Sequence, residues 1–422
     1  MPWPGTTKPF FGVLDWTSVP ERAESRAWPG PAPHPRSAYV KALLVKLCEG
    51  RPHITQLRRF LIGHPVLVLL LGFRPHWDAR QPYQFDPEQT VPCDRWLRAW
   101  QQRVDNAWLQ GLLASTVHAL QAEIPGLGQT VAVDVKHIFA WVQQNNPKAY
   151  VSQRYNPERQ PRGDPDCRLG VKRHHNQEEP DGTSHAHKEY VWGYGTGLVS
   201  ATHPRYGDVV LAEYTQPFNE ADITYFEPLR QRVTATLGCT PSHWAGDAAF
   251  DAWYVYQPAA EQGGLAAVPF NTRGQPRPTL DARGFPVCAR GLSMHAGPVS
   301  LEKAGFHSQR LLCPLLFPRP TGATCEHAQF AKGTGCIKQV NIELGGLLRL
   351  SLDRHSDAYR QVYKQRTSAE RINSQATALG IERPHVRNGH SIRNLNTLTY
   401  IVINVRALDR IRAAKARARV PT

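Results

Sequence analysis

The sequence predicts an α/β protein. Apolar residues recur at helical spacing up to about residue 125, and residues 130–136 then alternate strictly between apolar and polar. Farther along the chain, strand-like segments alternate with helix-like ones. This order predicts a mixed sheet with helices, preceded by an all-helical domain.

The N-terminal part is predicted to be an arm followed by helices. Residues 1–36 are rich in Pro, Gly and Trp without a period, which indicates a flexible arm. Residues 39–48 and 55–62 are expected to be helices, with Thr55 as N-cap of the second. A long helical stretch is predicted over residues 94–123. Residues 37–125 would bind DNA through basic side chains or mediate dimerisation, and the sequence favours neither function.

The α/β core is predicted to begin with the strand at residues 130–136, whose valines share one face while Asp134 lies on the other. Residues 190–200 and 208–215 are expected to form a hairpin. Further elements are a helix at 221–237, a strand at 242–248, a helix from Asp251 that Pro258 ends, and a strand at 265–270. A late helix carries Glu370.

Two segments interrupt the core. Residues 144–187 are polar and contain His174, His175, His185 and His187, while residues 271–345 are rich in Gly, Pro and Cys. In the second segment, a structural Zn²⁺ is one interpretation and buried free thiols are the other, because no two cysteines are spaced as Cys-x-x-Cys. The cysteines concerned are Cys288, Cys313, Cys325 and Cys336. Cys167 with the His-rich run is a less specific zinc candidate, and a loop near DNA phosphate explains that run equally well.

The net charge of +15 and the pI near 9.6 favour a polyanionic partner, most simply nucleic acid. Residues 371–422 hold ten Lys or Arg against two acids. A solvated basic tail is the alternative explanation for residues 410–419. The longest apolar run, residues 66–71, is too short to cross a bilayer, and no signal peptide is recognisable. Eight cysteines in a long chain without a recognisable signal peptide indicate a reducing compartment. We therefore expect a cytoplasmic protein, and the basic charge suggests that it associates with the nucleoid. Walker and Rossmann phosphate-binding motifs are absent from the sequence.

One stripe of the late helix carries functional groups. Tyr359, Tyr363, Arg366, Glu370 and Asn373 would share one face of a continuous helix. A buried carboxylate needs a cation, so such a stripe suggests a site. A solvated helix with an Arg366–Glu370 ion pair is the alternative.

Three acids are candidate metal ligands: Asp134, Asp247 and Glu370. Divalent metal would neutralise such a cluster, and Mg²⁺ prefers oxygen ligands. Two Mg²⁺ ions about 4 Å apart can activate an attacking hydroxyl and stabilise the leaving 3′-oxygen. Each acid alone could be structural, and Asp247 could cap the following helix, although Asp251 is better placed for that.

These residues resemble a known family. Tyr363-x-x-Arg366-x-x-x-Glu370, within Arg-Thr-Ser-Ala-Glu-Arg-Ile-Asn, is similar to the signature of DDE-type insertion-sequence transposases. Val-Ala-Val-Asp134-Val-Lys and Gly-Asp247-Ala-Ala-Phe-Asp resemble the first and second acidic motifs of that family. The resemblance covers roughly residues 36–410.

The resemblance implies an RNase H-like catalytic core over residues 126–405, with an insertion at 271–345 and a basic tail at 406–422. Asp134, Asp247 and Glu370 would bind Mg²⁺ or Mn²⁺, as two ions in the family's manner. Tyr363 and Arg366, with Asn373 beside them, would position the helix or the DNA end. The family often has a Lys seven residues after the Glu, where this chain has Thr377; Arg371 or Arg383 would take over its DNA contact, together with Lys136.

The expected function is therefore DNA cleavage at element ends followed by strand transfer into target DNA. The partners would be terminal inverted repeats and target DNA, bound by a homodimer or a larger synaptic complex. A metal-dependent nuclease without joining and an inactive, transposase-derived DNA-binding protein are the alternatives. A zinc-stabilised interaction module is a further one.

Overall fold

The computed structural model describes residues 7–23, 32–175, 186–272 and 277–419. The chain forms two compact units. The larger holds Met1–Gly128, Asp134–Gly238 and Thr367–Thr422, and the smaller holds Gln129–Val133 and Cys239–Arg366. The boundary between them passes through the first strand of the sheet. The N-terminal helices therefore share a unit with the strands that lie between residues 134 and 238.

Helices dominate residues 36–123, as predicted. The stretch at 94–123 is two helices, because the chain leaves the helix at Val104 and Asp105 then caps the next helix, accepting a 2.9 Å hydrogen bond from the Ala107 N–H. Thr55 is not an N-cap, since the buried Ile54 already begins its helix and His53 precedes it. The helices are α2 (Arg36–Cys48), α3 (Ile54–Ile62), α4 (Pro65–Leu71), α5 (Pro87–Thr90), α6 (Asp94–Arg103) and α7 (Asn106–Glu123).

The prediction of a flexible N-terminal arm is wrong for residues 7–19. Helix α1 (Thr7–Gly12) and a 3-10 turn, η1 (Trp16–Ser18), form there. Phe10 and Phe11 are buried, and the Asp15 N–H donates to the Ser115 hydroxyl of α7 over 3.1 Å. Burial of aromatic side chains outweighs the effect of the Pro- and Gly-rich composition.

The sheet is mixed, which confirms the α/β prediction. Its strand order is β2-β3-β1-β5-β6, and β4 also pairs with β3. Strands β2, β3 and β4 pair antiparallel, and the β3–β4 pair is the predicted hairpin, whereas β1, β5 and β6 pair parallel. The strands are β1 (Thr130–Phe139), β2 (Arg168–His175), β3 (Ala186–His203), β4 (Gly207–Pro217), β5 (His243–Ala245) and β6 (Leu265–Ala267).

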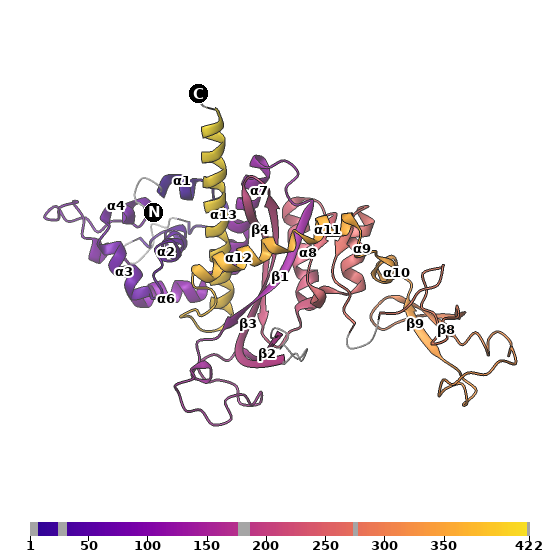
Figure 1. The fold of residues 1–422 in the computed structure, drawn as a ribbon. Helices are drawn as coiled ribbons and strands as arrows, with labels where there is room; N and C mark the ends of the chain where they lie inside the picture. The colour runs from indigo at the N-terminus through magenta and orange to yellow at the C-terminus, as the bar shows by residue number, and fades with distance from the viewer. Residues whose placement is uncertain (1–6, 24–31, 176–185, 273–276, 420–422) are drawn as a thin grey trace, which may run out of the picture. The chain divides into compact units, whose positions relative to one another are not determined.

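In the larger unit, helix α13 (Gly389–Arg419) lies along α7 and β4 (Figure 1). Asn404 joins the three elements. Its amide nitrogen donates to Thr116 of α7 and to the Val210 carbonyl of β4, and its oxygen accepts from the Val210 N–H, all within 2.8 Å. Helix α8 (Phe226–Leu237) packs on β3 and β4. The segment predicted as a basic tail is helical up to residue 419, with Ile411 buried and Lys415 paired to Glu123.

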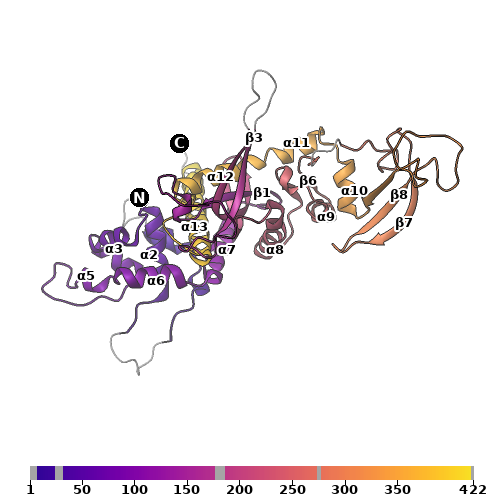
Figure 2. The same ribbon diagram turned by 90° about the horizontal axis from the view of Figure 1, so that it is seen from below.

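The smaller unit combines parallel strands, helices and a separate sheet. Helix α9 (Trp253–Glu261) packs beside α10 (Leu344–Ser351), and α11 (Asp357–Tyr363) packs on β5 and β6 (Figure 2). The prediction that Pro258 ends its helix is wrong, because α9 continues to Glu261 and its buried residues, Val255 and Tyr256 among them, hold it in place. The Cys-containing segment forms an antiparallel sheet of β7 (His295–Leu301), β8 (His307–Leu312) and β9 (Ile337–Asn341).

In the described part of the chain, no single helix has both the length and the apolar character needed to cross a bilayer. Helices α3 and α4 meet that test only as a pair, which is bent by 109°.

Candidate active site

Helix α12 (Arg366–Ala378) is fastened to the strands of the larger unit by polar contacts. Arg371 forms two hydrogen bonds with the buried Asp208 of β4, at 2.6 and 2.7 Å. The hydroxyl groups of Ser368 and Ser200, both fully buried, lie 2.8 Å apart. Ala369, Ile372 and Ala376 of α12 are fully buried as well. These contacts fix both the position and the rotation of the helix.

Asp134 meets α12 through Asn373. The Asn373 amide nitrogen donates to Asp134 Oδ2 over 2.8 Å. Three buried residues precede Asp134 in β1, while Asp134 itself is half-buried. Asn373 Oδ1 is buried and has no hydrogen-bond partner among the described residues. The Asp134 carboxylate is therefore next to an amide group whose oxygen accepts no hydrogen bond in the described structure.

Glu370 precedes Asn373 by three residues on α12 and is exposed. Residues at i and i+3 are neighbours on one helix face, with roughly 5–6 Å between their Cβ atoms. Glu370 thus shares the face that reaches Asp134. Thr377, at the position where the resembling family often has Lys, donates its hydroxyl to the Asn373 carbonyl at 2.9 Å and stays on its own helix.

Asp247 belongs to the smaller unit and follows β5. Strand β5 runs parallel to the start of β1, and Ala245 is the register partner of Ala132. Asp134 and Asp247 each follow this pair by two residues. Asp247 caps the 3-10 turn η4 (Ala248–Phe250) by accepting from the Ala249 N–H at 2.9 Å. The structure thus brings Asp134 together with α12 and places Asp247 in the other unit.

Asp251 is not the helix cap that the sequence suggested. It is buried and accepts hydrogen bonds from the Tyr256 hydroxyl (2.7 Å), the Asn271 N–H (2.7 Å) and the Arg349 guanidinium (2.7 Å). Burial, and then the nearby Asp251, raise the pKa of Tyr256. Asp251 therefore organises the interior of the smaller unit.

The predicted continuous stripe is interrupted, because the chain leaves the helix at residues 364–365 between α11 and α12. Part of the stripe persists in the smaller unit. The rings of Tyr359 and Tyr363 stack with centroids 5.6 Å apart, and the Arg366 guanidinium lies 5.8 Å from the Tyr363 ring centroid. Burial raises the pKa of Tyr359 to about 12.

The three side chains predicted to contact DNA have partners within the chain. Lys136 pairs with Glu382 at 2.5 Å, and this bond lowers the pKa of Glu382. Arg371 pairs with Asp208. The Arg383 guanidinium lies 4.1 Å from the Phe139 ring centroid and is exposed. Of the three, Arg383 has the cation most accessible to a phosphate.

Sequence reasoning missed a basic surface of the larger unit. A hollow of about 380 Å³ is lined by Arg154, Arg159, Arg162 and Arg387, among others. A second hollow shares Arg387 and adds Trp141, Arg98 and His385. A third shares His385 and adds Lys46, Arg51 and Arg383.

Exposed aromatic side chains lie on the same part of the chain. Arg387 lies 4.8 Å from the ring centroid of the exposed Trp141, and Tyr150 is also exposed. The signal available in the sequence was the run of arginines among tyrosines over residues 150–162.

The zinc candidate built on Cys167 is wrong. Cys167 is buried and precedes β2, whereas His174 and His175 end that strand. An extended strand of this length separates them by roughly 20 Å. His185 lies outside the described residues. Cys288, Cys313 and Cys336, in contrast, are buried in one cluster against which Cys325 packs.

Where the residues are described, no three His, Cys, Asp or Glu side chains are arranged as a ready metal-binding group. The Asp134 carboxylate that Asn373 contacts is of the oxygen-ligand type that Mg²⁺ prefers. Neither a scan against models of known protein families nor a search of curated proteins finds a match to this chain.

Proposed function

We propose that this protein is a DDE-type transposase with an RNase H-like core, which cuts DNA at element ends and joins the freed 3′ ends to target DNA. The observation that carries the proposal is the 2.8 Å hydrogen bond from Asn373 to Asp134. Through it, helix α12, which carries Arg366 and Glu370 of the Tyr-x-x-Arg-x-x-x-Glu sequence, lies against the strand with the first acid. Those two elements are more than 230 residues apart in sequence, counted from Asp134 to Asn373.

The parallel pairing of β1 and β5 supports a shared role for Asp134 and Asp247. In the register of these strands, Asp134 inside β1 and Asp247 just beyond β5 each follow the paired Ala132 and Ala245 by two residues. Asp134, Asp247 and Glu370 would hold Mg²⁺ or Mn²⁺. Bound metal would neutralise the carboxylates and stabilise charge that develops on the transferred phosphate. Asn373 would keep Asp134 in a fixed orientation through its hydrogen bond to Oδ2.

The basic surface around Arg387 supports DNA as the substrate. Its guanidinium groups can neutralise backbone phosphates, and the exposed Trp141 ring offers a face for base stacking. The exposed Arg383 extends the set of basic residues, whereas Lys136 and Arg371 are held by Glu382 and Asp208. Two element ends must be held together for joining, so the protein would act as a dimer or larger complex, associated with the nucleoid in the cytoplasm.

A Mg²⁺-dependent cleavage and joining assay tests the proposal. The substrate is DNA that carries the element's flanking ends, and the variants are Asp134→Asn, Asp247→Asn and Glu370→Gln. Asp357→Asn is the matched control, because Asp357 is almost fully exposed and pairs only with Arg360 among the described residues. We expect cut and joined products from the wild type and the control and none from the three variants.

The other outcomes separate the alternatives. Cleavage without joined product would replace the proposal with a metal-dependent nuclease. DNA binding without any product, in Mg²⁺ or Mn²⁺, would indicate an inactive DNA-binding protein. Full activity of Glu370→Gln would remove Glu370 from the site.

A further inference from the structure

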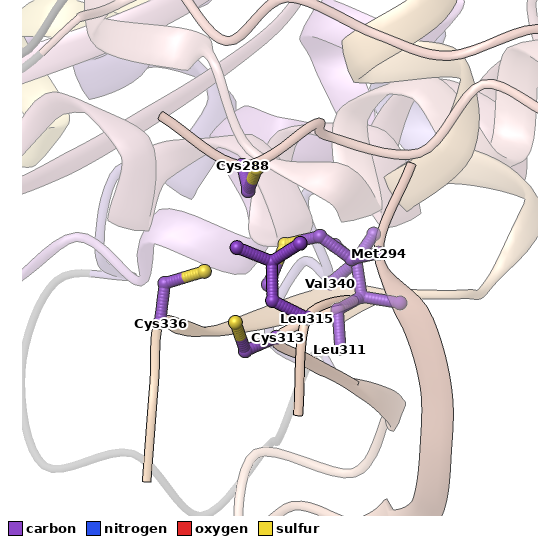
Figure 3. Packing of buried hydrophobic residues seen from close by; sticks show 7 residues of the cluster. All are labelled: Cys288, Met294, Leu311, Cys313, Leu315, Cys336 and Val340. Atoms are coloured by element: carbon purple, nitrogen blue, oxygen red, sulfur yellow. The ribbon is translucent and has the colours of Figure 1, made fainter. Parts of the chain in front are cut away.

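The core of the small antiparallel sheet is built largely from thiols. Its buried members are Cys288, Met294, Leu311, Cys313, Leu315, Cys336 and Val340 (Figure 3). Cys325 packs against this cluster from a half-buried position. Half of the protein's eight cysteines thus gather in one place, although they come from separate segments between residues 288 and 336.

The pairing of β8 with β9 brings two of these cysteines together. Leu312 and Ile337 are the last register pair of the antiparallel strands. Cys313 follows the first and Cys336 precedes the second, so the two lie opposite each other. In Figure 3 their sulfurs turn into the same space, with Cys288 across from them. Burial and the neighbouring Cys313 and Cys288 raise the pKa of the Cys336 thiol.

Backbone geometry admits the close approach of the sulfurs. Gly335, with φ of +62°, lies against Cys313, and a Cβ there would be 2.4 Å from Cys313 Cβ and 2.9 Å from its sulfur. Only glycine fits at this position. Cys288 opens a turn in which its carbonyl accepts from the Gly291 N–H at 2.9 Å. Tight, glycine-containing turns therefore place both Cys336 and Cys288.

Basic side chains tie the cysteine segments to one another. The Arg290 guanidinium donates to the Thr324 carbonyl at 2.7 Å, which links the Cys288 turn to the residue before Cys325. Lys338 Nζ donates to the Val287 carbonyl at 2.6 Å, which links β9 to the residue before Cys288. Two cations thus lie close to the cluster in sequence and in space.

Hydrophobic burial alone gives this sheet little stability. Its core has seven buried residues among those described, and Val299 and Leu301 of β7 are exposed. Small modules of this kind usually need a disulfide or a structural metal. All the cysteines of the chain are free thiols in the structure.

We propose that Cys288, Cys313, Cys325 and Cys336 bind one structural Zn²⁺. On binding, the four thiols release four protons to solvent and four Zn–S bonds form, which leaves a centre of charge −2 that Arg290 and Lys338 partly offset. The four sulfurs do not form a ready-made ligand group, so binding would draw them to about 2.3 Å from the ion, with the Cys325 segment closing onto the cluster. This inference does not depend on the proposed DNA chemistry.

Metal analysis of tag-free, full-length protein tests the site. We expect about one zinc per chain in the wild type and in Cys239→Ser, whose thiol is exposed and lies outside the cluster. Cys313→Ser/Cys336→Ser should lose the zinc. Replacement of zinc by Co²⁺ should give the thiolate-to-cobalt absorption of a tetrahedral sulfur site in the wild type and the control only.

A measurement on the wild type alone keeps the test decisive if the double variant fails to fold. Titration with a mercurial that caps thiols should release the zinc in step with modification of the four cysteines, and chelation should lower the unfolding temperature. Folded wild-type protein without zinc that also binds no Co²⁺ would overturn the proposal. So would a mass 2 Da below that of the reduced chain, which indicates a disulfide in the cluster.

Discussion

At the scale of single residues, Asn373 is the side chain that connects helix α12 with the Asp134 carboxylate. It donates to Asp134 while its own oxygen is buried without a partner in the described structure. Ordinary packing does not require such an arrangement, because an unsatisfied buried oxygen costs stability. A buried polar atom that lacks a hydrogen-bond partner is often found at a functional site.

Asn373→Ala should therefore reduce DNA cleavage more than it reduces stability. Loss of a hydrogen bond to a charged group costs about 1.5–3 kcal/mol, partly offset here by removal of the unpartnered oxygen. We expect a cleavage rate about tenfold lower, with a higher Mg²⁺ requirement and unchanged DNA affinity. Ser374→Ala, at the next and exposed position of α12, is the control. An unchanged Mg²⁺ dependence would make Asn373 a structural residue only.

Glu213 is a buried acid without a place in the proposed chemistry. It is 1% exposed and accepts hydrogen bonds from Thr397 at 2.6 Å and from Gln110. Burial raises its pKa, although Arg232 opposes the shift. The folded protein therefore holds this proton more tightly than the unfolded chain does. The stability that depends on it is complete below the unfolded pKa, near 4.3, and is lost as pH rises through the folded value.

Glu213→Gln should accordingly stabilise the protein relative to the wild type, and more so as the pH rises from about 4 to 7. Glutamine keeps an oxygen that accepts the two hydrogen bonds but carries no charge. Unfolding temperatures measured across this range check the prediction, with Glu220→Gln at an exposed position as control. A difference that is constant with pH would contradict it.

At the scale of elements, α12 is placed by contacts that its sequence pattern does not reveal. Arg371 was predicted to contact DNA, yet its guanidinium is bound by Asp208 of β4. Arg371 could thus either contact a DNA phosphate or hold α12 against β4. The two roles differ in what a substitution changes.

Arg371→Ala should lower the stability of the protein by about 1–3 kcal/mol, because it leaves the buried Asp208 unpaired. The dependence of DNA affinity on salt should stay as in the wild type. Denaturant unfolding and binding titrations at several salt concentrations measure the two quantities. Retained stability with a salt slope reduced by about one would instead assign Arg371 to a DNA phosphate.

At the scale of the whole molecule, part of the basic excess behind the net charge of +15 lines hollows of the larger unit. Arg159, Arg162 and Arg387 line one hollow of the larger unit and are exposed. They come from distant segments, so counting charges along the chain located the excess in the C-terminal part but not this surface.

Replacement of these three arginines by alanine should weaken DNA binding for every sequence tested. Each lost phosphate contact should reduce the salt slope of log K by about 0.9. Arg80→Ala, on a side chain that is 90% exposed and paired with Asp78, should leave the slope unchanged. Loss of affinity for one sequence only would indicate contacts to bases instead.

The sequence by itself determined the α/β class, the helical N-terminal part and the strand that carries Asp134, because periodicity and alternation are local properties of the chain. It also singled out Asn373 and the four cysteines of the small sheet. The predictions of a flexible N-terminal arm, an N-cap at Thr55, a helix end at Pro258 and a capping role for Asp251 were wrong. Burial against distant residues decides each of these features.

Only the tertiary structure decided which of these residues meet. The contact of Asn373 with Asp134 depends on the anchoring of α12 by Asp208 and Ser200, and the thiol cluster depends on the pairing of β8 with β9. Such contacts join residues far apart in sequence. Their free energy comes from packing between distant segments, which local sequence patterns do not encode. The sequence could therefore identify these side chains but not their positions in the fold.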